Sequence, residues 1–181
     1  MKETNLKRYI KTDLPDTKEG LTTDIVRLLQ AAGYEVVETN TSKPWGSYVR
    51  IHNDQADDFV REFFLGLSSE EARLGIEGTE LSPKILIVAP GQRLSWQYHH
   101  RRAERWTFLT EGGYNKSLDD DPGDSVIARA GDVVQFEKSE RHRLNGLDTG
   151  YVVVAEIWQH TDPAAPSDED DIIRLYDDYA R

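Results

Sequence analysis

The chain has no cysteine among its 181 residues, and this absence excludes several kinds of site. Without thiols there is no disulfide scaffold, no thiol catalysis, no iron–sulfur cluster and no cysteine-ligated zinc. A chain of this length needs no such staples, because it can bury roughly 70% of its unfolded surface in one core. We therefore expect one domain with short appendages, in which any metal site uses nitrogen and oxygen ligands.

Long hydrophobic runs are also missing. The longest are Ile85–Ala89 and Tyr151–Ala155, far short of the ~20 residues that a membrane-spanning helix requires. The segment from Met1 to Pro15 lacks the apolar core of a secretory signal. The formal net charge of −11 disfavours nucleic acid and anionic membrane surfaces, because like charges repel. The sequence thus predicts a cytoplasmic protein that binds neither nucleic acid nor membrane.

Residues 1–42 predict an appendage that is first helical and then extended. Leu21, Ile25 and Leu29 recur at helical spacing, and Gly33 stands where a glycine commonly ends a helix. The candidates for the N-cap of this helix are Thr22, Thr23 and Asp24.

Two further helical segments are expected within the remaining residues 43–181. In the segment 53–81, Phe59, Phe63 and Leu67 recur at helical intervals, and Ser68 with Glu71 forms a capping box. This segment predicts a helical insertion. The acidic tail predicts a short C-terminal helix at about 170–179.

From Ser82 onward, the pattern is that of short strands separated by turn residues. Strands are predicted at 85–89, 94–98, 104–110, 124–129, 132–136, 142–147 and 151–158, with Gly112–Gly113 among the turns. So many closely spaced strands predict a sandwich, a jelly roll or a barrel. The predicted fold class is all-β, with N-terminal, inserted and C-terminal helices.

Four polar side chains form the strongest candidate for a functional site. Gln97 and His99 lie two residues apart on a predicted strand and therefore project to one face. Glu104 on the next strand and His142 on a later one can point into the same space. An amide oxygen, two imidazoles and a carboxylate suit a divalent ion, with zinc first and manganese, iron or nickel as alternatives.

The spacing of these residues resembles the two motifs of the cupin family, G-x5-H-x-H-x3,4-E-x6-G and G-x5-P-x-G-x2-H-x3-N. The family positions are occupied by Gly91, His99, Glu104, Gly131 and His142. Gln97 replaces the first histidine of the first motif, and Asn145 comes one residue early in the second. The resemblance implies a single cupin double-stranded β-helix, the jelly-roll barrel, over residues 43–181.

Within the cupins, residues 43–52 and 82–181 resemble the isomerase domain of type II phosphomannose isomerases. The segments that carry this resemblance are Lys43–Tyr48, Leu94–Gln97, Arg102–Trp106, His142–Asn145 and Glu169–Arg181. It implies interconversion of mannose 6-phosphate and fructose 6-phosphate, with a metal held by Gln97, His99, Glu104 and His142. It also places Lys84 and Arg102 near the substrate.

The chain departs from that pattern around the implied pocket. Arg101 and Arg105 stand where the pattern usually has histidine, and Trp158–His160 replaces a Gln-x-Gly. These changes leave the ligand set intact and bear on the identity of the substrate.

An aldose–ketose isomerase moves a proton between C1 and C2, and this step needs a base. The candidates are water on the metal ion, Glu156 on the last strand, and Lys84 if burial lowers its pKa. The substrate phosphate needs fixed positive charge, and arginines cluster beside the two ligand motifs. The candidates for phosphate recognition are Arg101, Arg102, Arg105, Arg141 and Arg143.

Two other functions fit the same barrel. One is a non-catalytic cupin that binds a metal and a sugar as a sensor or accessory module. The other is a cupin dioxygenase, which a glutamine in place of the first histidine disfavours. In each case the expected partner is a small molecule, and exposed aromatic edges favour a homodimer.

Overall fold

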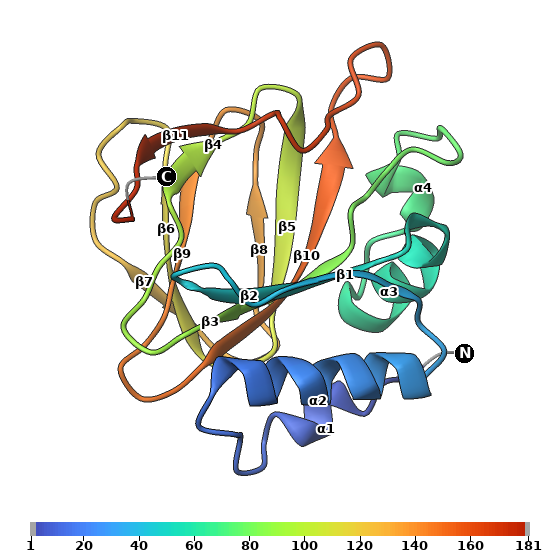
Figure 1. The fold of residues 1–181 in the computed structure, drawn as a ribbon. Helices are drawn as coiled ribbons and strands as arrows, with labels where there is room; N and C mark the ends of the chain where they lie inside the picture. Colours follow the sequence, from blue (N-terminus) through green and yellow to red (C-terminus); the bar gives the residue numbers. More distant parts are fainter. Residues whose placement is uncertain (1–2, 180–181) are drawn as a thin grey trace.

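Two antiparallel sheets face each other, with all the helices outside them (Figure 1). The computed structural model describes residues 3–179. The first sheet has the order β1-β2-β3-β10-β5-β8 and the second β11-β4-β9-β6-β7. The strands of the first sheet are β1 (Val36–Asn40), β2 (Gly46–Ile51), β3 (Lys84–Val88), β5 (Arg102–Phe108), β8 (Val133–Phe136) and β10 (Val152–His160). The strands of the second are β4 (Trp96–Tyr98), β6 (Gly112–Ser117), β7 (Val126–Ala128), β9 (Arg141–Asn145) and β11 (Ile173–Tyr176).

The two longest apolar runs of the sequence supply most of β3 and the first residues of β10, which lie side by side at the centre of the first sheet. Every residue of β3 is buried, because both faces of the strand are covered. Ile85 and Ile87 face the helices, whereas Leu86 and Val88 face the barrel interior. A strand buried on both faces explains why these runs are continuous rather than alternating.

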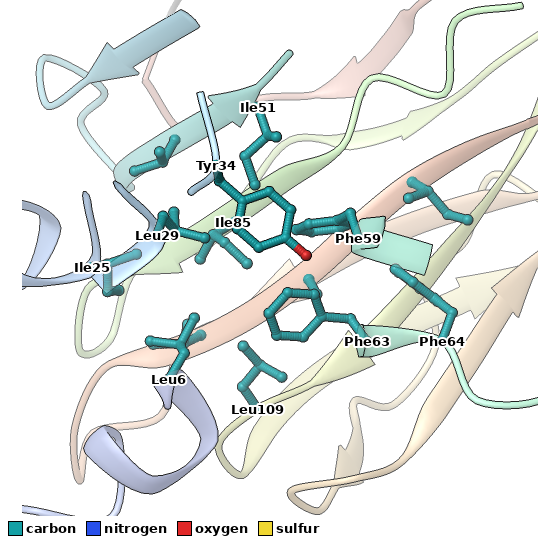
Figure 2. Close-up of a cluster of buried hydrophobic side chains, with 14 of the residues drawn as sticks. Leu6, Ile25, Leu29, Tyr34, Ile51, Phe59, Phe63, Phe64, Ile85 and Leu109 are labelled. Atoms are coloured by element: carbon teal, nitrogen blue, oxygen red, sulfur yellow. The ribbon is translucent and has the colours of Figure 1, made fainter. Parts of the chain in front are cut away.

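The helices cover the outer face of the first sheet. They are α1 (Leu6–Tyr9), α2 (Lys18–Ala31), the 3₁₀ helix η1 (Asn53–Gln55), α3 (Ala56–Phe63) and α4 (Ser69–Ala72). Figure 2 shows how Leu29 from α2 and Phe59 and Phe63 from α3 meet Ile51 and Ile85 of the sheet. Within residues 3–179, the helices are too short and too polar for any of them to cross a membrane.

The start of α2 differs from the prediction. Thr17 is the N-cap, and its hydroxyl accepts a hydrogen bond from the backbone N–H of Gly20 at 3.2 Å. The predicted caps lie inside the helix instead, where the hydroxyl of Thr22 donates to the carbonyl of Lys18. The predicted end is confirmed, because Gly33 follows the last helical residues with a φ of 85°.

The inserted segment is helical as predicted, and it contributes to the core. Phe59, Phe63 and Phe64 are each at most 1% exposed. Ser68 and Glu71 form the predicted capping box at the start of α4. The insertion is also tied to the sheet, since the hydroxyl of Thr107 donates to the carbonyl of Phe63 at 2.8 Å.

The predicted C-terminal helix at 170–179 is wrong. The segment instead forms β11, which pairs antiparallel with β4 at the edge of the second sheet. Ile173 and Tyr176 are 38% and 56% exposed, so the apolar side chains of this segment are not buried together as a docked helix would require. Its backbone groups gain ladder hydrogen bonds to β4 instead.

The turn predicted at Gly112–Gly113 is also wrong, because these residues begin β6. A Cβ atom added to Gly112 would lie 2.4 Å from Cγ1 of Val152. A glycine is therefore needed at this position because the chain passes close to the buried side chain of Val152, and not because the chain turns here.

Candidate metal centre and adjoining pocket

Three of the four predicted ligands meet inside the barrel. His99 Nε2 lies 2.9 Å from Glu104 Oε1, and His142 Nε2 lies 3.2 Å from Glu104 Oε2. His99 directly follows β4, Glu104 is on β5 and His142 is on β9, so the two sheets jointly build the cluster. Each residue is at most 2% exposed, and one donor atom from each lies within 4.8 Å of the others.

Both histidines are oriented by main-chain carbonyls. The Nδ1 of His99 bonds to the carbonyl of Asp171, and the Nδ1 of His142 bonds to that of Glu140 at 3.0 Å. A carbonyl can only accept, so each Nδ1 carries the hydrogen and each neutral Nε2 offers a lone pair. Both lone pairs therefore point at the carboxylate of Glu104.

This arrangement leaves buried polar atoms unsatisfied. Among the described residues, Glu104 Oε2 and His142 Nε2 are buried without a hydrogen bond, although they lie near each other. Two acceptors facing each other in a buried site repel unless a proton or a cation lies between them. The donor set thus fits a divalent cation.

The ionisation of the cluster suits a cation too. Burial alone would raise the pKa of Glu104, but its polar neighbours, among them the guanidinium of Arg102 at 3.0 Å, hold it well below its ordinary value. Burial lowers the pKa of His99, which favours the neutral imidazole. We therefore assign the balancing positive charge to Arg102. One carboxylate and two neutral imidazoles form a nitrogen–oxygen set typical of zinc, manganese, iron or nickel sites.

Gln97, the fourth predicted ligand, is beside the cluster. It is the cross-strand partner of His142, so both side chains lie on the same face of the sheet. Its amide oxygen accepts a hydrogen bond from the hydroxyl of Ser95 at 2.7 Å. Coordination by Gln97 stays a prediction.

A cavity of about 160 Å³ adjoins the cluster. It is lined by Lys43, Trp45, Tyr48, Lys84, Leu86, Leu94, Ser95, Gln97, Arg102, Glu104, Glu156, Trp158, Glu169, Ile172 and Arg174. Its wall on the first sheet carries charges of both signs on adjoining strands. Lys84 on β3 is the cross-strand neighbour of Glu156 on β10, and Glu104 on β5 is the cross-strand neighbour of Trp158 on β10.

Glu156 is a buried carboxyl in this wall, with 7% exposure. The indole N–H of Trp106 donates to its Oε2 at 2.9 Å. Burial and the charge of Glu104 raise the pKa of Glu156 to about 7, against the opposing effects of Lys84, Arg102 and the Trp106 hydrogen bond. A carboxyl that titrates near neutrality beside a candidate metal centre is suited to proton transfer.

Lys84 and Arg102 supply the positive charge next to these carboxylates. The ammonium of Lys84 is 3.0 Å from Glu169 Oε1 and 4.7 Å from the ring centroid of Trp158. The guanidinium of Arg102 donates to Glu104 Oε1 at 3.0 Å and lies 4.0 Å from the same ring. Trp158 thus supports both cations by cation–π contacts.

The other predicted arginines do not line the cavity. Arg101 bonds to Asp168 at 2.7 Å and to the carbonyl of Pro166. Arg105 donates to Gln135 Oε1 at 2.9 Å, on the face of β5 opposite to Glu104. Arg141 bonds to Asp120, and Arg143 lies under the C-terminal segment near Tyr176. Of the five candidates, the structure brings Arg102 alone to the cavity.

Sequence reasoning missed the contribution of the C-terminal segment. Glu169, Ile172 and Arg174 line the cavity, and Asp171 orients His99. The acidic run has the composition of a helix start, since carboxylates favour helix N-termini. The contribution of this segment could have been inferred from the resemblance to the isomerase domain, because that resemblance extends to the end of the chain.

A family profile described as "Mannose-6-phosphate isomerase C-terminal" matches residues 75–177, more than half of the chain. The chain belongs to this family. The matched range contains every predicted metal, catalytic and substrate-binding residue. The predicted all-β cupin jelly roll is confirmed, apart from its C-terminal helix. No curated protein sequence matches the chain significantly.

Solved structures agree with this fold. The capsular polysaccharide assembling protein CapF from Staphylococcus aureus is similar with a TM-score of 0.51 and 14% identity, over 87% of this chain and 39% of CapF. CapF in complex with the inhibitor 3-isopropenyl-tropolone gives a TM-score of 0.50 and 15% identity, over 95% of this chain and 45% of that one. The chain therefore spans less than half the length of CapF.

Proposed function

We propose that this protein is a metal-dependent aldose–ketose isomerase that acts on a sugar phosphate, interconverting mannose 6-phosphate and fructose 6-phosphate. The single observation that carries the proposal is the position of Glu156. This buried carboxyl and the carboxylate of Glu104 line the same small cavity. A proton carrier and a cation site on one cavity are the two requirements of this reaction. Membership of the mannose-6-phosphate isomerase C-terminal family supports the choice of substrate.

Gln97, His99, Glu104 and His142 would hold one divalent ion, with zinc as the first candidate. When bound, the ion would polarise the substrate carbonyl and stabilise the negative charge that develops on its oxygen, an effect worth several kcal/mol. The main-chain bonds to His99 and His142 would keep both Nε2 atoms directed at the site, whatever the substrate.

Glu156 would remove the proton from one sugar carbon and return it to the neighbouring carbon. With a pKa of about 7, it exists as both acid and base near neutral pH, so it can perform both halves of the transfer. Trp106 holds one of its carboxyl oxygens and fixes the direction of the group. Lys84, its cross-strand partner, is the alternative base.

Arg102 would bind the substrate from the same cavity. Its guanidinium lies between Glu104 and the ring of Trp158, where positive charge can meet an anionic or oxygen-rich ligand. The predicted substrate contacts of Arg101 and Arg105 have no support from the cavity, because each side chain bonds elsewhere. We propose that these two residues affect an anionic substrate only through the long-range field of their positive charges.

The test is proton exchange at C2 of the sugar. The metal-loaded protein is incubated with mannose 6-phosphate in deuterium oxide. NMR then follows two signals, the fructose 6-phosphate formed and the deuterium incorporated at C2 of mannose 6-phosphate. We expect both signals, and we expect E156Q to lower the rate by 10²-fold or more. E137Q, which changes an exposed glutamate in the same way, should keep the rate of the unmodified protein. No exchange and no product from the loaded protein would contradict the proposal.

A second candidate is a non-catalytic cupin that binds a metal and a sugar. It is favoured by the charge pairing in the cavity, since Lys84 is paired with Glu169 and Arg102 with Glu104. Saturable binding of mannose 6-phosphate without exchange at C2 would identify this function. Consumption of oxygen in the presence of iron would instead identify a dioxygenase.

We further propose that the protein works in the cytoplasm as a homodimer. Edge strands β7 and β8 expose Val126, Ile127 and Val133, each at least 45% accessible. Light scattering coupled to size exclusion tests this, and a monomer at all concentrations up to 100-fold above those used for assay would contradict it.

A further inference from the structure

The C-terminal segment crosses the end of the barrel that holds the metal cluster (Figure 1). Its residues before β11 contact the ligand strands repeatedly. Ser167 and the carbonyl of Asp168 accept hydrogen bonds from Arg102, and Glu169 pairs with Lys84. The segment is therefore bonded to two cationic side chains that line the cavity, one on β3 and one on β5.

Asp171 is the most deeply anchored acidic residue of this segment, with 5% exposure. Its Oδ1 accepts the backbone N–H of His100 at 2.8 Å, and its Oδ2 accepts that of Arg101 at 2.9 Å. The hydroxyl of Ser167 donates to the same Oδ2 at 2.8 Å. The carboxylate therefore caps the turn between β4 and β5, which are the strands that carry Gln97 and Glu104.

The main chain of Asp171 acts on a ligand directly. Its carbonyl accepts the Nδ1–H of His99 and thereby directs Nε2 toward Glu104. The carboxylate fixes the turn that follows His99, and the carbonyl fixes the ring. One residue from the far end of the chain thus holds both the backbone and the imidazole of a candidate ligand.

We propose that Asp171 is a positioning residue for the metal centre, and that metal binding and the docking of residues 167–176 stabilise each other. A docked segment holds His99 in the orientation that binds a cation, so the cation must in turn favour the docked segment. This reciprocity is a thermodynamic necessity for two coupled events. The inference depends on the metal site of the proposed function and not on isomerase activity.

The carboxylate is needed because three donors converge on its two oxygens. An asparagine offers one acceptor oxygen, and its NH₂ group would face either the N–H of His100 or the donors of Arg101 and Ser167. D171N therefore loosens the segment with little change in side-chain volume. A loosened segment no longer holds the carbonyl that orients His99.

The decisive experiment is a zinc titration of the full chain after chelator treatment, with a chromophoric chelator as competitor. We expect D171N to weaken zinc affinity by 10- to 100-fold, which is the usual effect of removing a group that orients a metal ligand. The matched control is D170N, which removes the same charge from an exposed neighbouring side chain. D170N should stay within about 2-fold of the unmodified protein. Equal affinities of D171N and D170N would overturn the proposal.

S167A provides a second variant that changes no charge. It removes the hydroxyl that joins Asp171 to Arg102, so we expect a smaller loss of zinc affinity in the same direction. Two readouts separate positioning from a general loss of stability. The visible spectrum of the cobalt-loaded protein should change in D171N, and zinc should slow hydrogen exchange in residues 167–176 of the unmodified protein but less in D171N.

The outcomes distinguish this inference from the proposed function. If zinc binding depends on Asp171 but the protein shows no isomerisation, this inference stands and the proposed isomerase activity is contradicted. If D171N and S167A leave the zinc affinity unchanged, this inference is overturned and the proposed isomerase activity is not contradicted. A chain that binds no divalent ion would overturn both.

Discussion

Lys84 and Glu156 are directly opposite each other on β3 and β10, with both side chains in the wall of the cavity. The pair places a buried ammonium next to a buried carboxyl, and Glu169 from the C-terminal segment also reaches the ammonium. Glu104, on the other side of β10, is also in this wall and is paired with Arg102. Burial and the charge of Glu104 raise the pKa of Glu156, and this explains why Glu156 tends to keep a proton.

The first prediction concerns metal content. H99A and E104Q should each purify with less than a tenth of the bound metal of the unmodified chain, because H99A removes one of three converging donors and E104Q removes the negative charge of another. H100A is the matched control, since it changes the exposed neighbouring histidine. Elemental analysis by mass spectrometry measures the result. Unchanged metal content in H99A and E104Q would contradict the ligand assignment.

The second prediction concerns the pH dependence of stability in the chelator-treated protein. Folding raises the pKa of Glu156 from 4.5 to about 7, so the folded state binds more protons than the unfolded state between these values. The free energy of unfolding contributed by this group is therefore present below pH 4.5 and is lost as pH rises to about 7.

E156Q removes this titration while keeping the size of the side chain. We expect E156Q and the unmodified protein to be equally stable near pH 4.5, and E156Q to be more stable by roughly 2–3 kcal/mol above pH 7. Urea unfolding across this pH range measures the difference. A constant difference at every pH would show that Glu156 titrates normally.

The third prediction tests the role of the inserted helices. F63A should lower the free energy of unfolding by about 3–5 kcal/mol, because Phe63 is 1% exposed in the core between α3 and the sheet. L65A is the control, since Leu65 is 82% exposed and should change stability by less than about 0.5 kcal/mol. Chemical denaturation measures both variants. Similar, small effects would mean that the insertion does not share the core.

The fourth prediction tests the close approach at Gly112. G112A should destabilise the protein by about 1–3 kcal/mol, because the new methyl group would lie 2.4 Å from Val152. G150A should be neutral or nearly so, since nothing lies within 4 Å of its added Cβ. Thermal unfolding measures both, and a neutral G112A would show that β6 can move away.

The metal cluster was predictable from the sequence because its members lie at fixed spacings on strands. The alternation of a strand places Gln97 and His99 on one face, and the structure brings His99 together with Glu104 and His142. The central strands were predictable as continuous apolar runs. Residue type and spacing are sufficient where one element's own periodicity decides the outcome.

The rest depended on contacts between distant residues. The segment around Asp171 has the acidic composition of a helix start, and only its pairing with β4 makes it a strand. Gly112 has the composition of a turn, and only the proximity of Val152 explains it. In each case tertiary contacts outweigh the local pattern.

The most direct test of the metal centre is a crystal structure of the zinc-loaded protein, with diffraction data collected on both sides of the zinc absorption edge. We predict one strong anomalous peak within about 2.0–2.2 Å of donor atoms of His99, Glu104 and His142. A peak at any other place, or none beside these three side chains, would contradict the account.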